Sequence, residues 1–147
     1  MYENEYSLIE KKIKNLNLKD SLNFICEFLQ KNIKGYDWVG YYFHNDKNQL
    51  VLKTYFGLKT DHTIIPFGKG ICGQTAESNM HIIVDDVNDE ENYISCNINV
   101  KSEIVVPLFS NNKNIGQIDI DSNTPVSYTH LRAHETRHDL VCRLLLE

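Results

Sequence analysis

The stretch that decides the fold is Glu103-Ile-Val-Val-Pro-Leu-Phe-Ser110, followed by Asn111-Asn-Lys-Asn114 and then by Ile115-Gly-Gln-Ile-Asp-Ile-Asp121. Two apolar-rich runs flank a short polar turn, which predicts a β-hairpin. Upstream, Trp38–Phe43 and Gln49–Phe56 predict a second hairpin, and His81–Asp85 predicts a further strand. The sheet is therefore built from hairpins.

Helical spacing of apolar residues predicts helices over residues 5–16 and 20–34, the second with Asp20 as its N-cap. A short helix is predicted from Gly70 to Ser78, and residues 57–67 are predicted as a loop. Hairpins with helices before and between them favour an antiparallel sheet over a parallel βαβ arrangement. The predicted fold class is therefore α+β.

Composition excludes several classes of protein. The chain has 147 residues, one domain's worth, and a net charge of −5 argues against a nucleic-acid partner. No apolar run approaches the roughly 20 residues of a membrane span, and the acidic N-terminus lacks the apolar stretch of a signal peptide. We therefore expect a cytoplasmic protein, whose four cysteines are free, structural or catalytic.

The composition changes abruptly after Pro125. Residues 1–125 hold 12 Lys, 16 Asn, 15 Ile and no Arg, whereas residues 126–147 hold 3 Arg and none of the other three. The tail resembles a translated sequencing adapter, and we expect it to be foreign to the domain at 1–125. The alternative is a native amphipathic C-terminal helix, because Leu140, Val141, Leu144 and Leu145 fit one apolar stripe.

Gly68-Lys-Gly-Ile-Cys-Gly73 matches G-x-G-x-x-G, the pattern of dinucleotide-binding loops. That motif needs a preceding strand and a full βαβ unit, and the neighbouring sequence predicts neither. We interpret the glycines as a tight loop that opens a helix, whose N-terminus favours a thiolate at Cys72. Cys26 lies in the apolar stripe of its helix and is predicted to be a core residue.

Three acidic residues come together if the last hairpin has one particular register. In Ile118-Asp-Ile-Asp121 the isoleucines face one side of the strand and the aspartates the other. A hairpin that pairs Ser110 with Asn114 places Glu103 opposite Asp121. On a solvent-facing surface these carboxylates would be unremarkable. In a pocket, their repulsion would require a cation, such as the ammonium group of a ligand.

Cys96 lies in a long polar stretch, residues 86–101, with no apolar stripe to bury it. A loop cysteine is more often reactive than a core one, although loop cysteines without a role are also common. A zinc site of Cys72, Cys96, His62 and His81 lacks the C-x-x-C or H-x₃-H spacing of such sites. We therefore predict no metal site.

Taken together, these features resemble the free methionine-(R)-sulfoxide reductases, which are stand-alone GAF domains. The resemblance covers about residues 5–125 and implies a GAF-like central antiparallel sheet with flanking helices. It rests on five features: Trp38-Val-Gly-Tyr-Tyr42, Gly68-Lys-Gly-Ile-Cys-Gly73, the spacing of 24 from Cys72 to Cys96, Ser102-Glu-Ile-Val-Val-Pro-Leu108 and Ile115-Gly-Gln-Ile-Asp-Ile-Asp-Ser122.

The resemblance implies a role for each matched residue. Cys96 would be the nucleophile and Cys72 the resolving cysteine. Free methionine sulfoxide would be the substrate and thioredoxin the reductant, without a cofactor. The sequence leaves a homodimer open as the assembly state. The implied substrate-binding residues are Trp38, Tyr42, Glu103, Asp119 and Asp121.

The chain departs from the family pattern at two positions. Many members carry a cysteine where this chain has His62, and the residue after the nucleophile is usually Asp, here Asn97. The family's C-terminal helix is missing or replaced by the tail. Two rival functions stay open: a GAF domain that senses a small ligand without catalysis, and a peroxide-sensing thiol protein.

Overall fold

The computed structural model of the chain describes residues 2–89 and 99–125. Cys96 and the tail from residue 126 onward, both singled out in the sequence, lie outside the described residues. The described elements are α1 (Tyr2–Ile13), α2 (Leu18–Asn32), β1 (Trp38–His44), β2 (Gln49–Phe56), β3 (Ile64–Pro66), α3 (Gly70–Ser78), β4 (Ile82–Val84), the 3₁₀ helix η1 (Val87–Asp89), β5 (Ser102–Ser110) and β6 (Lys113–Ser122).

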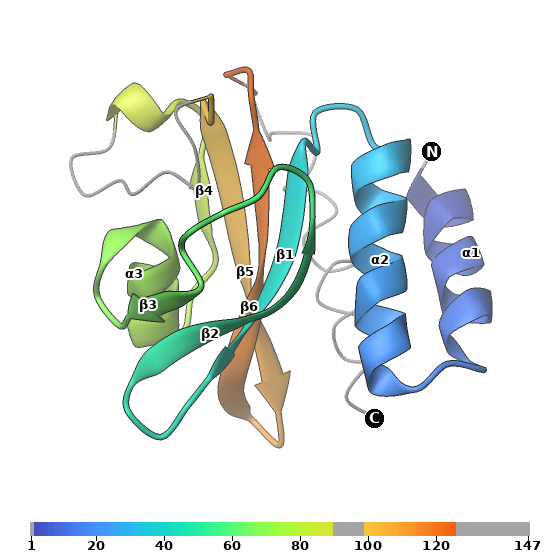
Figure 1. Ribbon diagram of the computed structural model, residues 1–147, viewed down its shortest axis with the longest axis horizontal. Helices are drawn as coiled ribbons and strands as arrows, with labels where there is room; N and C mark the ends of the chain where they lie inside the picture. Colours follow the sequence, from blue (N-terminus) through green and yellow to red (C-terminus); the bar gives the residue numbers. More distant parts are fainter. Residues whose placement is uncertain (1, 90–98, 126–147) are drawn as a thin grey trace.

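The six described strands form one sheet in the order β3-β2-β1-β6-β5-β4, and each neighbouring pair is antiparallel. Helices α1 and α2 lie on one side of this sheet and α3 on the other (Figure 1). The predicted α+β fold, an antiparallel sheet with flanking helices, is confirmed. Within the described residues, no helix combines the length and apolar character needed to cross a membrane.

Period-two alternation in β1 divides the interior into two cores. Val39 and Tyr41 point into a core shared with α1 and α2. Trp38 and Tyr42 point to the opposite face, into a second core that includes residues of α3. The candidate substrate aromatics therefore lie on the α3 side of the sheet.

Helix α2 begins earlier than its sequence pattern predicts. Asn17 is the N-cap, and its side-chain oxygen accepts a hydrogen bond of 2.8 Å from the backbone N–H of Asp20. The prediction that Asp20 caps the helix is wrong, because Asn17 supplies the capping oxygen one turn upstream.

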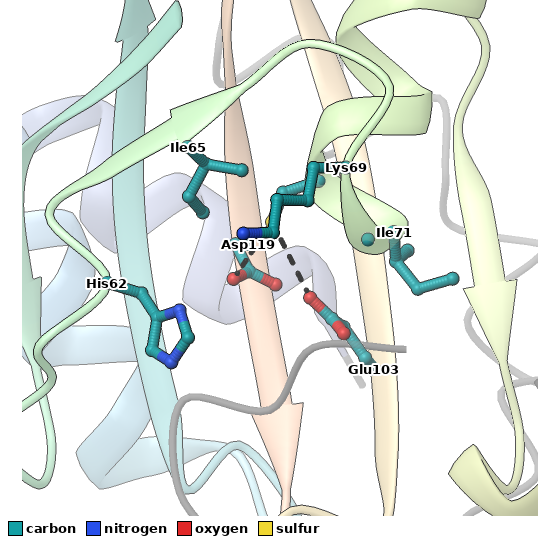
Figure 2. Close-up of a pocket in the computed structure, with 8 residues that line it drawn as sticks. His62, Ile65, Lys69, Ile71, Glu103 and Asp119 are labelled. Atoms are coloured by element: carbon teal, nitrogen blue, oxygen red, sulfur yellow. Dashed lines mark hydrogen bonds between the residues drawn. The ribbon is translucent and has the colours of Figure 1, made fainter. Parts of the chain in front are cut away.

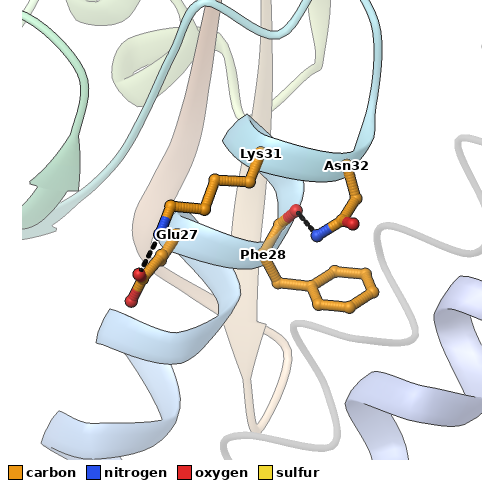
Figure 3. Close-up of polar contacts among 4 residues, drawn as sticks. All are labelled: Glu27, Phe28, Lys31 and Asn32. Carbon is orange, nitrogen blue, oxygen red and sulfur yellow. Dashed lines mark hydrogen bonds and ion pairs between the residues drawn. The ribbon is translucent and has the colours of Figure 1, made fainter.

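Two contacts on the outer surface of α2 are shown in Figure 3. Lys31 Nζ lies 2.6 Å from Glu27 Oε1, and Asn32 Nδ2 donates to the Phe28 carbonyl oxygen at 2.8 Å. Such an exposed ion pair contributes only about 0.3–0.5 kcal/mol. The helix is therefore fixed mainly by its apolar face, which is buried against the sheet: Leu22, Ile25, Cys26 and Leu29.

Cys26 is a core residue, as predicted. Its side chain is 1% exposed and belongs to the same core as α1 and α2. Burial raises the pKa of this thiol well above its usual range. A thiol that stays protonated is a poor nucleophile, so Cys26 is suited to packing and not to catalysis.

The turn between β5 and β6 is tighter than the four-residue loop predicted. Asn111 and Asn112 both have left-handed backbones, with φ of 51° and 64°, which makes the two-residue turn typical of hairpins. Ser110 therefore pairs with Lys113, and the pairing of Ser110 with Asn114 that was considered from the sequence does not form.

A β-bulge then restores the predicted register. Phe109 pairs with Asn114 but Leu108 pairs with Gly116, so Ile115 is an extra residue on β6. From there on, Glu103 lies opposite Asp121, as predicted.

One strand was missed. Ile64–Pro66 forms β3 at the edge of the sheet, inside the region predicted as a loop. Three residues are too few to show alternation, and Pro66 is a residue that the pattern would exclude from all but edge strands. Just before β3, the Thr63 carbonyl accepts a hydrogen bond of 2.9 Å from the backbone N–H of Leu52 in β2.

Candidate functional site

Three carboxyl groups are buried side by side on the α3 face of the sheet. Glu103 comes from β5, and Asp119 and Asp121 come from β6. Their side chains are 3%, 1% and 1% exposed, respectively. Of the two readings that the sequence left open, the pocket is therefore correct and the solvent-facing surface is not.

The thiol of Cys72 lies against this acidic group, of which Glu103 and Asp119 are labelled in Figure 2. Cys72 Sγ is 3.4 Å from Asp119 Oδ2 and 3.7 Å from Glu103 Oε1, within hydrogen-bonding range for sulfur. Cys72 is the third residue of α3, as the glycine-rich loop predicts. Gly73 is required there, because a Cβ at that position would lie 2.6 Å from the Pro66 carbonyl oxygen.

Burial changes the protonation of the acids. It raises the pKa of Glu103 well above its usual value, and the negative charges of Asp119 and Asp121 raise it further. Burial likewise raises the pKa of Asp119. Within the described part of the chain, neither Glu103 nor Asp119 forms an ion pair with a lysine, arginine or histidine. Protonation of a carboxyl group can therefore offset the repulsion that a bound cation would otherwise neutralise. The raised pKa favours the neutral form of Glu103.

Trp38 and Tyr42 form an aromatic wall beside the acids. The indole stacks on Tyr55 with ring centroids 5.4 Å apart and planes 18° apart. The Trp38 Nε1–H donates to the Leu58 carbonyl at 3.0 Å, and the Tyr42 hydroxyl donates to the His62 carbonyl at 2.8 Å. These bonds fix the orientation of both rings.

A pocket opens at Cys72, Glu103 and Asp119, and it is also lined by His62, Ile65, Lys69, Gly70 and Ile71. Figure 2 shows the Lys69 side chain extending across this pocket in front of Asp119. The free volume is about 10 Å³, room for roughly one water-sized group. An amino acid could therefore enter only if side chains at the mouth, such as the exposed Lys69, move aside.

Comparison with known proteins identifies the family. Residues 15–135 match the GAF domain family. The crystal structure of the free methionine-R-sulfoxide reductase from Neisseria meningitidis, in complex with its substrate, superposes with a TM-score of 0.89. It is 30% identical in sequence, and the match covers 99% of this chain and 86% of that one. This chain belongs to the free methionine-R-sulfoxide reductase family of GAF domain proteins.

Two curated relatives carry the same family name. The free methionine-R-sulfoxide reductase of Saccharomyces cerevisiae is 36% identical over 118 residues, which are 78% of this chain and 65% of the yeast protein. The Escherichia coli protein of that name is 36% identical over 94 residues, or 64% of this chain and 56% of its own length. The matched region thus spans roughly two thirds or less of these relatives.

The structure brings most of the residues implied by the family together. Cys72, Glu103 and Asp119 line one pocket, and Asp121, Trp38 and Tyr42 lie on the same face of the sheet. Cys96 lies outside the described residues. Among the described residues, His62 and His81 do not join the cluster of potential metal ligands around Cys72.

Two residues of this region were given no role from the sequence. Lys69 lines the pocket. Gln117 is fully buried, and neither its Oε1 nor its Nε2 has a hydrogen-bond partner in the described part of the chain. The sequence could have indicated its position, because Gln117 precedes Asp119 by two residues and therefore lies on the same face of the strand.

Gly40 is the position where the aromatic wall is most easily disturbed. An added Cβ would lie 2.3 Å from Cη2 of Trp38, so Gly40→Ala must displace the indole. We expect the substitution to cost roughly 1–3 kcal/mol in free energy of unfolding, measured by urea titration. Because the clash is with the outer indole ring, Trp38→Phe should recover part of that loss in a double variant. Strictly additive costs would contradict this.

Proposed function

We propose that this protein reduces free methionine-(R)-sulfoxide to methionine by thiol chemistry. The observation that carries the proposal is the buried carboxyl cluster of Glu103, Asp119 and Asp121 beside the thiol of Cys72. Membership of the reductase family supports it, as does the Neisseria meningitidis relative in complex with its own substrate. A cytoplasmic location and thioredoxin as the reductant are part of the same proposal.

Substrate selection follows from charge. Asp119 and Asp121 are both buried on the same face of the sheet, and an ammonium group would offset the repulsion between their carboxylates. Free methionine sulfoxide carries such a group, whereas a peptide-bound residue does not. Trp38 and Tyr42 would offer the S-methyl group of the substrate an apolar surface. The site would therefore favour the free amino acid.

The first chemical step is oxygen transfer. The thiolate of Cys96 attacks the sulfoxide sulfur while Glu103, held neutral by burial, donates a proton to the oxygen. The hydroxyl group then passes to the Cys96 sulfur as the transient sulfur–sulfur bond and the sulfur–oxygen bond of the substrate both break, so methionine leaves and Cys96 becomes a sulfenic acid. The protein thiol is oxidised by two electrons as the sulfoxide is reduced by two.

The second and third steps restore the enzyme. The Cys72 thiol condenses with the sulfenic acid of Cys96, which forms a disulfide and releases water. Thioredoxin then reduces this disulfide by thiol–disulfide exchange. The proposal requires Cys96 to reach Cys72. Its segment is flanked by Val87 and Lys101, which are joined by a 2.7 Å backbone hydrogen bond.

The test is an assay coupled to thioredoxin, thioredoxin reductase and NADPH with racemic free methionine sulfoxide. We expect consumption to stop near half of the racemate, because only one sulfoxide configuration is used. N-acetylmethionine sulfoxide is the matched control and should be inert. Equal activity on the acetylated substrate would refute the role of the acids. Binding without turnover would favour the small-ligand sensor.

A further inference from the structure

Three potential metal ligands of different chemistry meet in the pocket. Cys72 Sγ and one carboxyl oxygen each from Glu103 and Asp119 all lie within 4.8 Å of one another, and all three residues are buried. We propose that these three residues bind a thiophilic divalent cation, Zn²⁺. This set differs from the Cys72, Cys96, His62 and His81 set considered from the sequence.

The distances suit tetrahedral coordination. Zn–S bonds of about 2.3 Å and Zn–O bonds of about 2.1 Å, at tetrahedral angles, separate the sulfur from each oxygen by about 3.6 Å. The observed separations from Cys72 Sγ are 3.4 Å to Asp119 Oδ2 and 3.7 Å to Glu103 Oε1. A zinc ion could therefore replace the thiol proton with little movement of its ligands, with a water as the fourth ligand.

The donor types select among cations. A sulfur ligand disfavours Mg²⁺ and Ca²⁺, which prefer six or more oxygens, whereas Zn²⁺ accepts sulfur and oxygen together. The free volume of about 10 Å³ beside these residues admits a single ion or water. Both features favour a small, thiophilic ion over a larger ligand.

A second observation also points to a cation. Asp119 is 1% exposed and lines the pocket, yet its Oδ1 accepts no hydrogen bond within the described part of the chain. An orphaned carboxylate oxygen in a buried site is costly unless a proton or a cation neutralises it. Metal binding to such groups displaces protons.

The cation would compete with the substrate. It would bind Asp119, one of the two carboxylates proposed for the ammonium group, and would block Cys72 and Glu103, so it should inhibit the reductase reversibly. Binding of the ion stands on the geometry alone, and only the inhibition rests on the proposed function.

Cobalt is the probe for the test, because a cobalt–thiolate bond produces a near-ultraviolet charge-transfer band. Reduced full-length protein, freed of metal with a chelator, is titrated with Co²⁺ and then with Zn²⁺. We expect a band at one Co²⁺ per chain that Zn²⁺ abolishes. Cys72→Ser should remove the band, while Cys96→Ser and Cys26→Ser should keep it.

Asp119→Asn provides a second variant that keeps the thiol. It should weaken Zn²⁺ binding at least tenfold, since even outer-shell partners of metal sites change affinity by about 10–100-fold. Glu27→Gln on the exposed surface of α2 is the matched control and should bind as the unaltered protein does. Far-ultraviolet circular dichroism checks that each variant is folded.

Three results would overturn the site: no band in the unaltered protein, a band that survives Cys72→Ser, or unchanged zinc affinity in Asp119→Asn. A metal-free protein that fails to reduce the sulfoxide would instead refute the proposed function and leave the cation site standing.

Discussion

Cys96→Ser is expected to abolish methionine production altogether, whereas Cys72→Ser should still release up to about one methionine per chain. The difference follows from the order of the steps, because Cys72 acts only after methionine has left. Cys72→Ser should then stall as the Cys96 sulfenic acid, since His62 stands where many relatives offer another thiol. Quenched mass spectrometry after one exposure to substrate measures both methionine and the oxidation state of each cysteine.

Cys26→Ser is the control for this pair. Cys26 is a residue of α2, and its thiol is buried in the core on the opposite side of the sheet from Cys72. The substitution should cost roughly 1–3 kcal/mol in stability if the hydroxyl lacks a partner, and it should leave the redox cycle intact. A disulfide of the unaltered protein that maps to Cys26 or Cys142, in place of Cys72 with Cys96, would contradict the assignment.

Period-two alternation made much of the sheet predictable from sequence. Ile118 and Ile120 could be assigned to one face and the aspartates to the other, because neighbouring residues of a strand point to opposite sides. The structure places the isoleucines in the core with α2 and the aspartates with α3. The facing of Glu103 and Asp121 followed from the sequence under only one possible register of the hairpin, and the structure reaches it by a different route. The turn is shorter than expected, and the bulge at Ile115 offsets the difference.

The burial of the acidic residues in a pocket could not be predicted from the sequence. A strand with alternating aspartates fits a solvated face as well as a pocket, and only the packing of α3 over β5 and β6 decides between them. Helix α3 also comes close to the Pro66 carbonyl at Gly73, an approach that a glycine pattern signals only in general terms. The edge strand β3 and the placement of His62 beside Cys72 are likewise tertiary features that no local pattern encodes.

Glu103→Gln should separate activity from stability. Loss of a general acid typically lowers the rate by about 10²–10⁴-fold, and we expect a loss of that size here, measured in the coupled assay. An active Glu103→Gln variant would show that another group donates the proton.

In contrast to its activity, the stability of the Glu103→Gln variant should rise relative to that of the unaltered protein, and the difference should depend on pH. The pKa of Glu103 is raised in the folded protein by burial and by the nearby carboxylates, so the folded state binds the proton more tightly than the unfolded state does. Its stabilising contribution is complete below the ordinary pKa of 4.5 and is lost as pH rises through the folded-state pKa. Glutamine cannot ionise, so the free energy of unfolding of the variant should rise relative to that of the unaltered protein as pH rises, by at most about 1.4 kcal/mol per pH unit.

Urea unfolding across a pH series measures this slope, with Glu27→Gln as the control for loss of an exposed carboxylate. Parallel slopes for Glu103→Gln and the unaltered protein would mean that Glu103 is not held neutral by the fold.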